Sequence, residues 1–434
     1  MKLDNQEVIE FMFNSLPMYQ RVGAAAYKAN LDNTLAFDKI TGSPHKKYKT
    51  IHIAGTNGKG SVSHSLASIL QEAGYKTGLY TSPHLTDYRE RIRVNGKKIE
   101  ESFITEFINS HKNFIKNVKP SFFEMSVALA FKYFELQQVE VAVIEVGMGG
   151  RLDSTNIILP ELSVITNIGL DHTQFLGNSL AEIAGEKAGI IKQNIPVVIG
   201  ERQKETEEVF LKKAKEKNSK ISFASDNYAC KILNSNLKYS NFEVEKKTSD
   251  KSYTLNFNLS GKYQEKNLAT ILETVDNLRN QGFCISDENL KQGLENLIKN
   301  TGFHGRWETL NAEPLTICDT GHNKDGLSYT IEQLLSLEFK KLRFVLGFVN
   351  DKNVDEVLKL FPKNAEYYFC KAQIPRALDE KILLEKANLV SINGKSFENV
   401  SSAYHAAKKD ADKNDVIFIG GSTFVVADLL QEFA

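Results

Sequence analysis

Residues 51–61 are Ile51-His52-Ile53-Ala54-Gly55-Thr56-Asn57-Gly58-Lys59-Gly60-Ser61, a short apolar run that leads into a loop rich in glycine. An apolar run with β-branched residues is typical of a buried strand. Beyond the loop, apolar residues recur at helical spacing and predict a helix over residues 61–73; they are Val62, Leu66, Ile69, Leu70 and Ala73. This stretch therefore predicts a strand, a turn and a helix, the repeating unit of an α/β fold.

The loop between this strand and this helix is a candidate phosphate-binding site. Glycines let the backbone approach phosphate closely, the helix N-terminus directs unpaired N–H groups at the anion, and Lys59 adds a full positive charge. The match to the common pattern GxxxxGK(S/T) is imperfect, because Ile53 stands at the first glycine position and Gly60 follows the lysine. A glycine-rich turn that binds nothing is the alternative, but the strand–loop–helix context favours phosphate binding.

The same alternation continues along the chain. Further strands are predicted at residues 78–81, 141–146, 162–166 and 196–199. From Ile221 to Leu259 the pattern changes to period two, with Phe242 and Val244 before a polar turn and Tyr253 to Leu259 after it, which predicts an antiparallel hairpin beside the parallel sheet. Helical patterns follow at 266–281 and 287–299.

A second α/β unit begins near residue 315. Strands are predicted at 316–319, 343–347, 365–369 and 416–419, with helical patterns between them. About 130 residues with their own alternation are enough for a separate domain. We therefore expect an α/β protein with a phosphate-loop domain over residues 1–300, whose mostly parallel sheet is joined by a small antiparallel sheet, and a Rossmann-like domain over residues 301–434. The boundary is expected near 300–305.

Composition limits the classes of protein that remain. The chain has 434 residues, with 54 Lys and Arg against 54 Asp and Glu, so its net charge of 0 argues against nucleic acid or an anionic membrane as the main partner. A 41% hydrophobic content supports a full core, and the apolar runs are too short for a transmembrane helix. Residues 1–20 are expected to form an amphipathic helix and not a signal peptide. The isolated Cys230, Cys284, Cys318 and Cys370 form no CxxC pair and indicate reduced cysteines of a cytosolic protein.

Several polar residues fall at the carboxyl ends of predicted strands, where open α/β sheets bind ligands. Glu145 precedes Gly147-Met148-Gly149-Gly150 and is a candidate metal ligand, with an exposed loop carboxylate as the alternative. His172 follows the next strand, where a structural hydrogen bond is an equal alternative, and Mg²⁺ prefers oxygen ligands. For Lys187 the spacing alone indicates only helix surface. Arg306 at the domain boundary could clamp a phosphate or form an interdomain ion pair.

Taken together, nine segments resemble one family in their order and spacing. They are GTNGKGS (55–61), TSPHL (81–85), FFEMS (122–126), IEVGMGGRLDSTN (144–156), GLDHT (169–173), EKAGIIK (186–192), NLAT (267–270), GRW (305–307) and DTGHN (319–323). The chain is similar to the Mur ligase superfamily, and specifically to its folylpolyglutamate synthase/dihydrofolate synthase members. The resemblance implies an N-terminal ATP-binding domain of the Mur central type and a C-terminal glutamate ligase domain.

The resemblance also implies roles for single residues. ATP contacts fall on Asn57, Gly58, Lys59, Gly60, Ser61, Asn267, Arg306 and Asp319. Magnesium ligands fall on Ser82, Glu145 and His172, and Lys187 is the family's carbamylated lysine, an anionic ligand for a second magnesium. The pterin-binding segments fall on Phe122, Phe123, Glu124 and Met125 and on Leu152, Asp153 and Ser154. Lys59, Lys187 and His322 are the expected catalytic residues. The family's DxAHNP and PGR patterns differ here at Gly321, Lys324 and His304.

The activity implied is ATP-dependent addition of L-glutamate to dihydropteroate and to tetrahydrofolate or its polyglutamates, through an acyl phosphate. ATP, Mg²⁺ and a monovalent cation are the implied cofactors, and a cytoplasmic monomer is expected. Alternatives are a folylpolyglutamate synthase alone, a related ligase that acts on a cell-wall peptide precursor, and a regulatory protein that binds nucleotide without ligation. The pterin-side segments TSPHL and GGRLD favour folate, and the implied metal residues Glu145, His172 and Lys187 argue against simple nucleotide binding.

Overall fold

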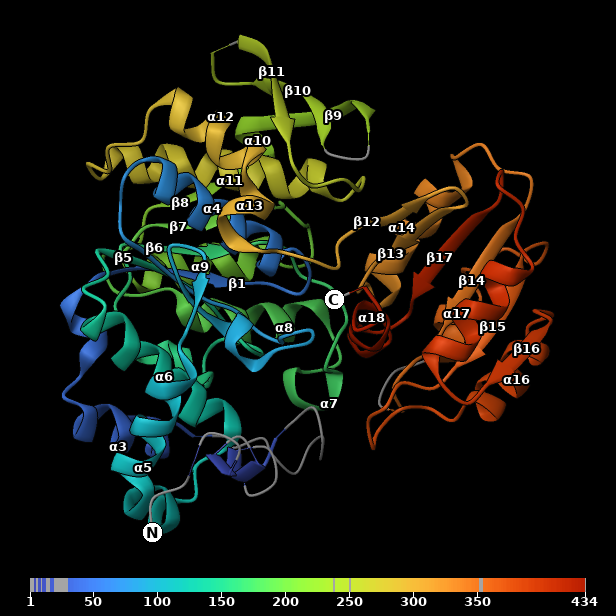
Figure 1. Ribbon diagram of the computed structural model, residues 1–434. Helices are drawn as coiled ribbons and strands as arrows, with labels where there is room; N and C mark the ends of the chain where they lie inside the picture. The colour runs from blue at the N-terminus through green and yellow to red at the C-terminus, as the bar shows by residue number, and fades with distance from the viewer. Residues whose placement is uncertain are drawn as a thin grey trace.

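The computed structural model describes residues 30–236, 239–249, 251–350 and 354–433, with 4, 7, 8, 10–12 and 16–18 near the N-terminus. The helix expected over residues 1–20 lies largely outside the described residues. Two α/β bodies lie side by side, and the chain passes from the larger to the smaller after α13 (Leu297–Thr301) (Figure 1). None of the helices described is both long and apolar enough to cross a membrane.

The larger body is built on an eight-stranded sheet in the order β4-β3-β2-β5-β1-β6-β7-β8. Its strands are β1 (Lys49–Ala54), β2 (Thr77–Tyr80), β3 (Ile92–Val94), β4 (Lys97–Lys98), β5 (Val141–Glu145), β6 (Leu162–Ile165), β7 (Val197–Ile199) and β8 (Ile221–Phe223). The pairs β2–β3 and β3–β4 are antiparallel and the others are parallel. Because Ile53 pairs with Glu145 across β1 and β5, the glycine-rich loop and this carboxylate leave the sheet at the same edge.

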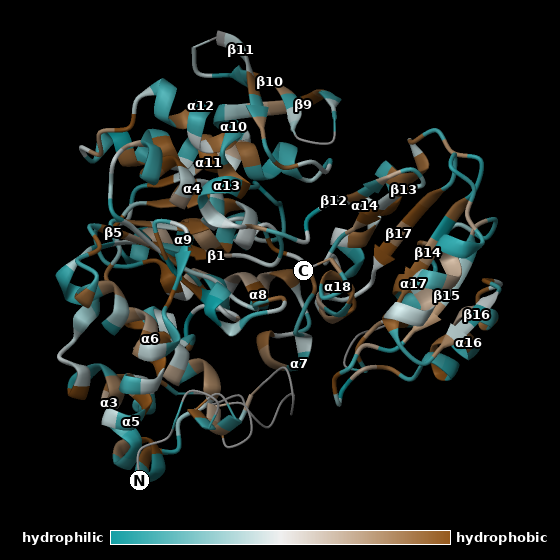
Figure 2. Ribbon diagram, viewed as in Figure 1, coloured by the Kyte–Doolittle hydropathy of each residue, from teal (hydrophilic) through white to brown (hydrophobic). Residues whose placement is uncertain are grey.

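Helices cover both faces of this sheet because its strands alternate their side chains between two cores. Ile51 and Ile53 face α4 (Lys59–Glu72), α11 (Gln264–Asn280) and α12 (Asp287–Glu295). Ala142 and Ile144 face α3 (Asp32–Thr41), α5 (Glu101–Val118) and α6 (Phe122–Leu136). At the β6–β7 end, α8 (Leu180–Lys187) and α9 (Glu207–Glu216) enclose a further core. Short helices are α7 (Thr173–Leu176), α10 (Ala224–Asn227) and the 3₁₀ turns Pro44–Lys47, Tyr88–Arg91, Ser154–Ile157 and Ala188–Ile190. Figure 2 shows the hydrophobic residues concentrated in the strands and on the inner sides of helices.

The small antiparallel sheet is confirmed, with differences in detail. Strands β10 (Ser240–Lys246) and β11 (Lys251–Phe257) form the expected hairpin, with Phe242 opposite Leu255. A third strand, β9 (Tyr228–Ser235), pairs with β10 and was not predicted, because its side chains beyond the buried Tyr228 are half-buried or exposed and leave little apolar alternation. Residues 221–223, placed in the antiparallel region by the sequence, instead form β8 of the parallel sheet. The helix expected over 287–299 is divided at Asn296 into α12 and α13.

The smaller body has its own six-stranded sheet in the order β12-β13-β17-β14-β15-β16, in which only β12 is antiparallel. Its strands are β12 (Glu308–Ala312), β13 (Leu315–Cys318), β14 (Leu342–Leu346), β15 (Glu366–Cys370), β16 (Gly394–Phe397) and β17 (Val416–Gly420). The helices are α14 (Lys324–Leu335), α15 (Val354–Leu358), α16 (Glu380–Leu389), α17 (Val400–Lys409) and α18 (Thr423–Leu430). The four expected strands are present. The sequence did not predict β12 and β16, which are more exposed edge strands. The α/β fold class is thus confirmed.

Candidate active site

The glycine-rich loop turns from β1 into α4 in a conformation that excludes side chains. Gly58, the residue before α4, has a φ of +83°, and a Cβ atom there would lie 2.2 Å from Oδ1 of Asn267. A Cβ atom on Gly55 would lie 1.8 Å from Oγ1 of Thr166, which donates to the carbonyl of Asn57 at 2.5 Å. The loop is therefore packed between α11 and the end of β6, and α4 begins at Lys59 and not at Ser61. Asn267 thereby lies beside the N-terminus of α4.

The side-chain nitrogens of two lysines lie close together against the carbonyl groups of this loop. Lys59 donates to the carbonyls of Gly55 and Thr56 at 3.1 and 3.2 Å, and Lys187 donates to the same Gly55 carbonyl at 3.0 Å. Lys187 is 4% exposed, so it is not the surface lysine that spacing alone indicated. Burial, reinforced by the charge of Lys59, lowers the pKa of Lys187 to about 7. A substantial fraction of its amine is therefore unprotonated at neutral pH.

The other expected metal ligands surround this position without forming a closed cluster. Glu145 is 4% exposed and accepts from the backbone N–H of Ser82 at 3.1 Å. Burial raises the pKa of Glu145, against the opposing charge of Lys59. His172 lies just before α7 and lines a cavity of about 20 Å³ with Lys59 and Lys187. Among the described residues, no three His, Cys, Asp or Glu side chains converge as a ready metal site.

The smaller body brings its own polar residues to the phosphate loop. His322 faces Asp171 across 3.3 Å from its Nε2 atom, while its Nδ1 atom lies 3.0 Å from the carbonyl of Thr320. Asn323 caps α14 and exchanges hydrogen bonds of 3.0 and 3.3 Å with Asn57. These contacts join the DTGHN segment to the phosphate loop. Asp171 and Asn323 were not predicted as site residues, and their place in the segments GLDHT and DTGHN is the signal that could have identified them.

Asp319 is 2% exposed and already carries three hydrogen bonds. Its carboxylate accepts from the hydroxyl of Tyr263 at 2.6 Å and from the backbone N–H groups of Trp307 and Gly321, each at 2.7 Å. It ties α11 to the segment that carries Arg306. The Arg306 guanidinium lies beside the phosphate loop, where its Nη2 atom is 3.8 Å from the position of a Cβ atom on Gly60.

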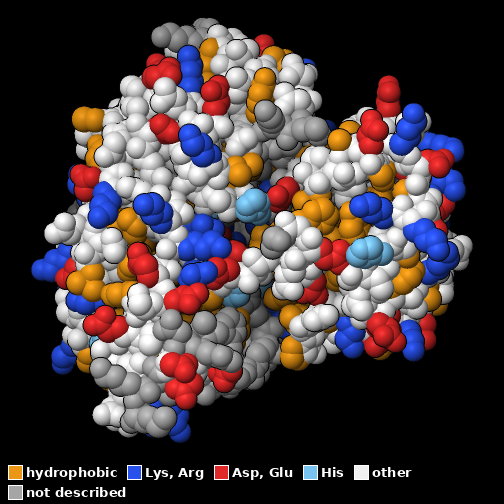
Figure 3. Space-filling model, viewed as in Figure 1, with side chains coloured by type: hydrophobic (Ala, Val, Ile, Leu, Met, Phe, Trp, Pro, Cys, Tyr) orange, Lys and Arg blue, Asp and Glu red, His pale blue; other side chains and the backbone are white. Residues whose placement is uncertain are grey.

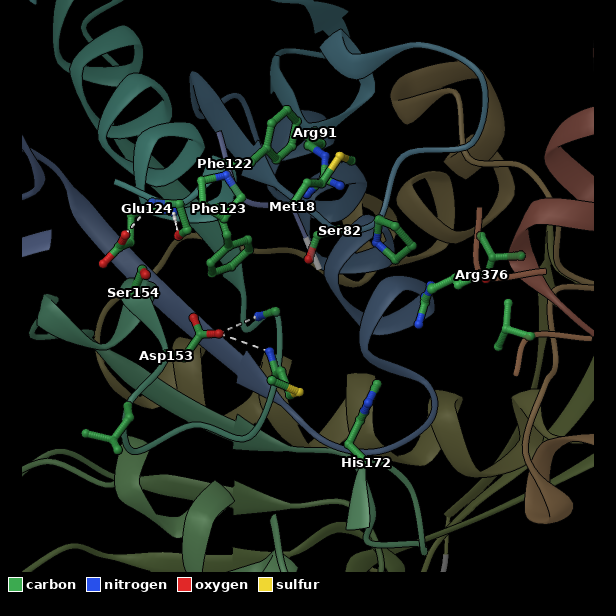
Figure 4. Close-up of a pocket in the computed structure, with 18 of the residues that line it drawn as sticks. Met18, Ser82, Arg91, Phe122, Phe123, Glu124, Asp153, Ser154, His172 and Arg376 are labelled. Carbon is green, nitrogen blue, oxygen red and sulfur yellow. Dashed lines mark hydrogen bonds between the residues drawn. The ribbon is translucent and has the colours of Figure 1, made fainter. Parts of the chain in front are cut away.

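An aromatic cavity of about 230 Å³ lies beside these groups (Figure 4). Its lining includes Phe122, Phe123, Glu124, Leu152, Asp153 and Ser154, all expected from the sequence, together with Ser82, His172 and His322. Met125 does not line the cavity; it is fully buried in the core, because the helical turn after Ser121 directs it away from Phe122 and Phe123. The expectation for Met125 is therefore corrected to a core residue.

Two carboxylates of this lining hold the cavity's backbone in place. Glu124 accepts from the N–H of Ser121 at 2.6 Å and completes the N-terminal cap of α6. Asp153 accepts from the N–H groups of Gly147 and Met148, both at 3.0 Å, and from the hydroxyl of Thr155 at 2.5 Å. Burial raises the pKa of Asp153, although these hydrogen bonds oppose the rise. Both side chains therefore fix the loops around the cavity.

Two arginines in this cavity were missed by the sequence reading. Arg91 is 3% exposed, donates to Nδ1 of His84 at 2.7 Å, and lies 5.3 Å from the ring centre of Phe122. Arg376 comes from the smaller body and lies 5.3 Å from the ring centre of Phe424. Figure 4 shows them on separate sides of the cavity. No spacing pattern marks either residue.

A second cavity of about 380 Å³ lies along the junction of the two bodies, and its lining includes Gly60, Ser82, Glu145 and Arg306. Figure 3 shows this face hollowed between the bodies, with Lys, Arg, Asp and Glu side chains at its margins. The phosphate loop therefore has open space on the side that faces Arg306.

The comparisons with known proteins agree with this geometry. Residues 53–273 match the Mur ligase middle domain, and residues 305–423 match the Mur ligase glutamate ligase domain. A dihydrofolate synthase/folylpolyglutamate synthase of Bacillus subtilis is 34% identical over 400 residues, which cover 89% of this chain and 91% of the relative. A probable bifunctional folylpolyglutamate synthase/dihydropteroate synthase of Haloferax volcanii is 31% identical over 440 residues, 98% of this chain, which spans only 50% of that longer protein.

Solved structures extend the similarity to the whole fold. Escherichia coli FolC in complex with DHPP and ADP superposes with a TM-score of 0.84 at 27% identity, over 99% of this chain and 98% of that chain. A Yersinia pestis folylpolyglutamate synthase/dihydrofolate synthase with Mn, AMPPNP and L-glutamate bound gives 0.81 at 27% identity, over 94% and 95%. The chain therefore belongs to the Mur ligase family, in its dihydrofolate synthase/folylpolyglutamate synthase branch of ATP-dependent glutamate ligases.

Proposed function

We propose that this chain joins L-glutamate to dihydropteroate and to tetrahydrofolate or its polyglutamates at the expense of ATP, through an acyl phosphate. One observation carries the proposal: Gly147, Met148 and His172 line both the aromatic cavity and the small cavity that holds Lys59 and Lys187. A planar pterin among Phe122, Phe123 and their neighbours would therefore have the phosphate loop within reach of its carboxylate end. Relatives with DHPP, ADP and L-glutamate bound support this choice of substrates.

The chemistry requires activation of a carboxylate. A carboxylate is a poor acyl donor because oxide is a poor leaving group, whereas phosphate leaves readily. A substrate carboxylate oxygen would attack the γ-phosphorus of ATP and release ADP. The amine of glutamate would then attack the carbonyl carbon, lose a proton, and expel inorganic phosphate. Phosphoryl transfer depends mainly on positioning and on neutralising charge.

The residues of both bodies divide this work. The backbone of the loop and of the start of α4 would bind the phosphates through Asn57, Gly58, Gly60 and Ser61. Lys59 would turn from the two carbonyls that it now contacts to the β- and γ-phosphates. Arg306 contacts the same phosphates from the other body. Asn267, which lies beside Gly58, and Asp319 would contact ATP as well. His322, which lines the aromatic cavity and is oriented by Asp171, contacts the transferred phosphate.

The donor set fits a hard divalent cation. Burial disfavours the charged form of Glu145, and a cation beside its carboxylate would remove that penalty. Ser82, Glu145 and His172 would hold one ion, and a carbamylated Lys187 would hold a second. When bound, Mg²⁺ would neutralise charge on the phosphates. A relative with Mn and AMPPNP bound supports a divalent cation at this nucleotide site.

The buried amine of Lys187 has the properties that carbamylation requires. Its unprotonated Nζ atom would form a bond to the carbon of CO₂ and release a proton, which converts a cation into an anionic oxygen ligand. The pKa of about 7 supplies the unprotonated amine at neutral pH. A carbamate would also place a negative charge on Lys187, which would attract the positively charged Lys59 where a protonated Lys187 would repel it.

The organisation of the protein forms part of the same proposal. We assign residues 1–300 to the ATP-binding domain and residues 301–434 to the glutamate ligase domain, in a cytoplasmic monomer that uses a monovalent cation beside Mg²⁺. The separate hydrophobic cores of the two sheets support this boundary. Because an acyl phosphate hydrolyses in water, the two domains should close over the bound substrates.

The decisive assay is glutamate-dependent release of phosphate from ATP in the presence of Mg²⁺, with dihydropteroate and tetrahydrofolate tested separately. Release with both substrates is expected. Release with tetrahydrofolate alone would reduce the function to polyglutamylation. Release with neither, in protein that binds ATP, would refute the proposal and favour another amide ligase or a regulatory role.

A further inference from the structure

A single aromatic ring packs against both the phosphate-loop helix and the arginine at the start of the second body. Phe303 stacks on His64 of α4, with ring centres 4.2 Å apart and planes inclined by 25°. The guanidinium carbon of Arg306 lies 5.6 Å from the centre of the same ring. The ring edge also faces Gly60, where a Cβ atom would lie 3.4 Å away. One ring thus contacts the helix, the loop and the arginine.

The segment that carries this ring is held at several points. Gly302 ends α13 in the left-handed conformation, with a φ of +58°. Arg93 of β3, which is 6% exposed, directs its guanidinium to the carbonyls of Gly302 and Gly96, each at 3.4 Å. On the far side, Asp319 accepts from the N–H of Trp307 at 2.7 Å. The segment 303–306 is therefore held at both ends, and a shift of Arg306 would also shift the Phe303 ring.

The imidazole that stacks on Phe303 is buried and uncharged. His64 is 5% exposed, and burial, with the charges of Arg93, Arg306 and His304, lowers its pKa well below the ordinary value. A neutral imidazole lies flat on a phenyl ring without the cost of burying a charge. The guanidinium lies over the same phenyl ring, 5.6 Å from its centre, and the electron-rich ring face attracts the cation.

We propose that Phe303 is a positioning residue of the ligation reaction: clamped on His64, its ring holds the Arg306 guanidinium beside Gly60, where the nucleotide phosphates bind. This inference rests on the proposed contact of Arg306 with ATP. An aliphatic side chain could fill the same volume, but it would offer neither a flat face to His64 nor a quadrupole to the guanidinium. The ring therefore does more than fill the core.

The test is a double-substitution cycle of Phe303→Leu and Arg306→Ala, followed by the affinity for ADP alone and by KM for ATP. Phe303→Leu should weaken ADP binding and raise the KM for ATP by about three- to tenfold, the range of a partly desolvated cation–π contact. The KM values for glutamate and the folate should change little. In the Arg306→Ala background, Phe303→Leu should have no further effect on ADP affinity, because the ring acts through the arginine.

Phe283→Leu is the matched control, since Phe283 is a 5% exposed phenylalanine of the same core that lies against Lys49, at the end of β1 opposite to the phosphate loop. It should lower thermal stability without altering ADP affinity. His64→Leu, which removes the stack without touching Phe303 or Arg306, should weaken ADP binding in the same direction. Equal effects of Phe303→Leu with and without Arg306 would overturn the inference. If Arg306→Ala itself leaves ADP affinity unchanged, the proposed role of Arg306 fails instead.

Discussion

Gly58→Ala is the substitution that most directly tests the geometry of the phosphate loop. Gly58 has a φ of +83°, and a Cβ atom there would lie 2.2 Å from Oδ1 of Asn267. Two costs follow: the left-handed backbone becomes strained, and Asn267 must retreat by about 0.8 Å to restore a 3.0 Å contact. Because we assign Asn267 to ATP binding, its displacement should lower the affinity for ATP as well as the stability of the fold.

The size of each cost can be separated. A left-handed conformation costs a non-glycine residue about 1–2 kcal/mol. The retreat of Asn267 disrupts its 2.8 Å hydrogen bond to Gln264, in a buried site. Such a bond contributes about 1 kcal/mol. We therefore expect Gly58→Ala to lower the free energy of unfolding by about 2–3 kcal/mol.

Gly42→Ala provides the matched control, because Gly42 has a φ of +86° and a Cβ atom there would meet nothing within 4 Å. It should lose only the backbone contribution of about 1–2 kcal/mol, without any change in ATP affinity. Denaturant unfolding gives the stabilities, and titration with ADP gives the affinities. In an Asn267→Ala background, Gly58→Ala should cost no more stability than Gly42→Ala costs in the wild type, because the side chain that the new Cβ atom would displace is absent. Equal stability and equal ADP affinity in Gly58→Ala and Gly42→Ala would refute the reasoning.

Three further predictions use other parts of the site and the fold. Lys59→Met should reduce glutamate-dependent phosphate release at least about 100-fold, because the transferred phosphate loses its nearest fixed charge; turnover close to that of the wild type would remove Lys59 from the mechanism. Lys187→Ala should be inactive and should regain part of its turnover when formate or acetate is added, and failure of both acids would count against the carbamate. Burial alone would raise the pKa of Asp87, but hydrogen bonds from Arg89 and Lys98 outweigh it and lower that pKa to about 2. Because this pKa is depressed on folding, Asp87 stabilises the fold above its unfolded pKa of about 3.9 and loses that effect as pH falls towards 2. The stability difference between wild type and Asp87→Asn, followed by denaturant unfolding, should therefore shrink from pH 5 to pH 3, and a constant difference would contradict the assignment.

The sequence alone determined the elements whose patterns are local. The run from Ile51 to Ser61 predicted a strand, a tight loop and a helix, because burial on a sheet and on a helix face imposes different spacings on apolar residues. The period-two alternation around Phe242 and Leu255 predicted the hairpin in the same way. Among the strands that it missed, β9, β12 and β16 are more exposed, so burial leaves no clear alternation in their sequence. The strands β3 and β4 were missed as well, because three and two residues are too few to show a period, although β3 is buried.

The identity of the site residues came from the order of nine segments, but their environment came only from the tertiary structure. Spacing placed Lys187 on a helix surface, whereas the fold buries it against the carbonyl of Gly55, 132 positions away in the chain. The same holds for Arg91 and Arg376, which no periodicity distinguishes from surface arginines. Met125 shows the converse, since a helical turn directs it into the core although its neighbours line the cavity. Periodicity reports which face of an element is buried, but pKa values and clefts depend on which distant groups are packed against that face, and this only the assembled chain decides.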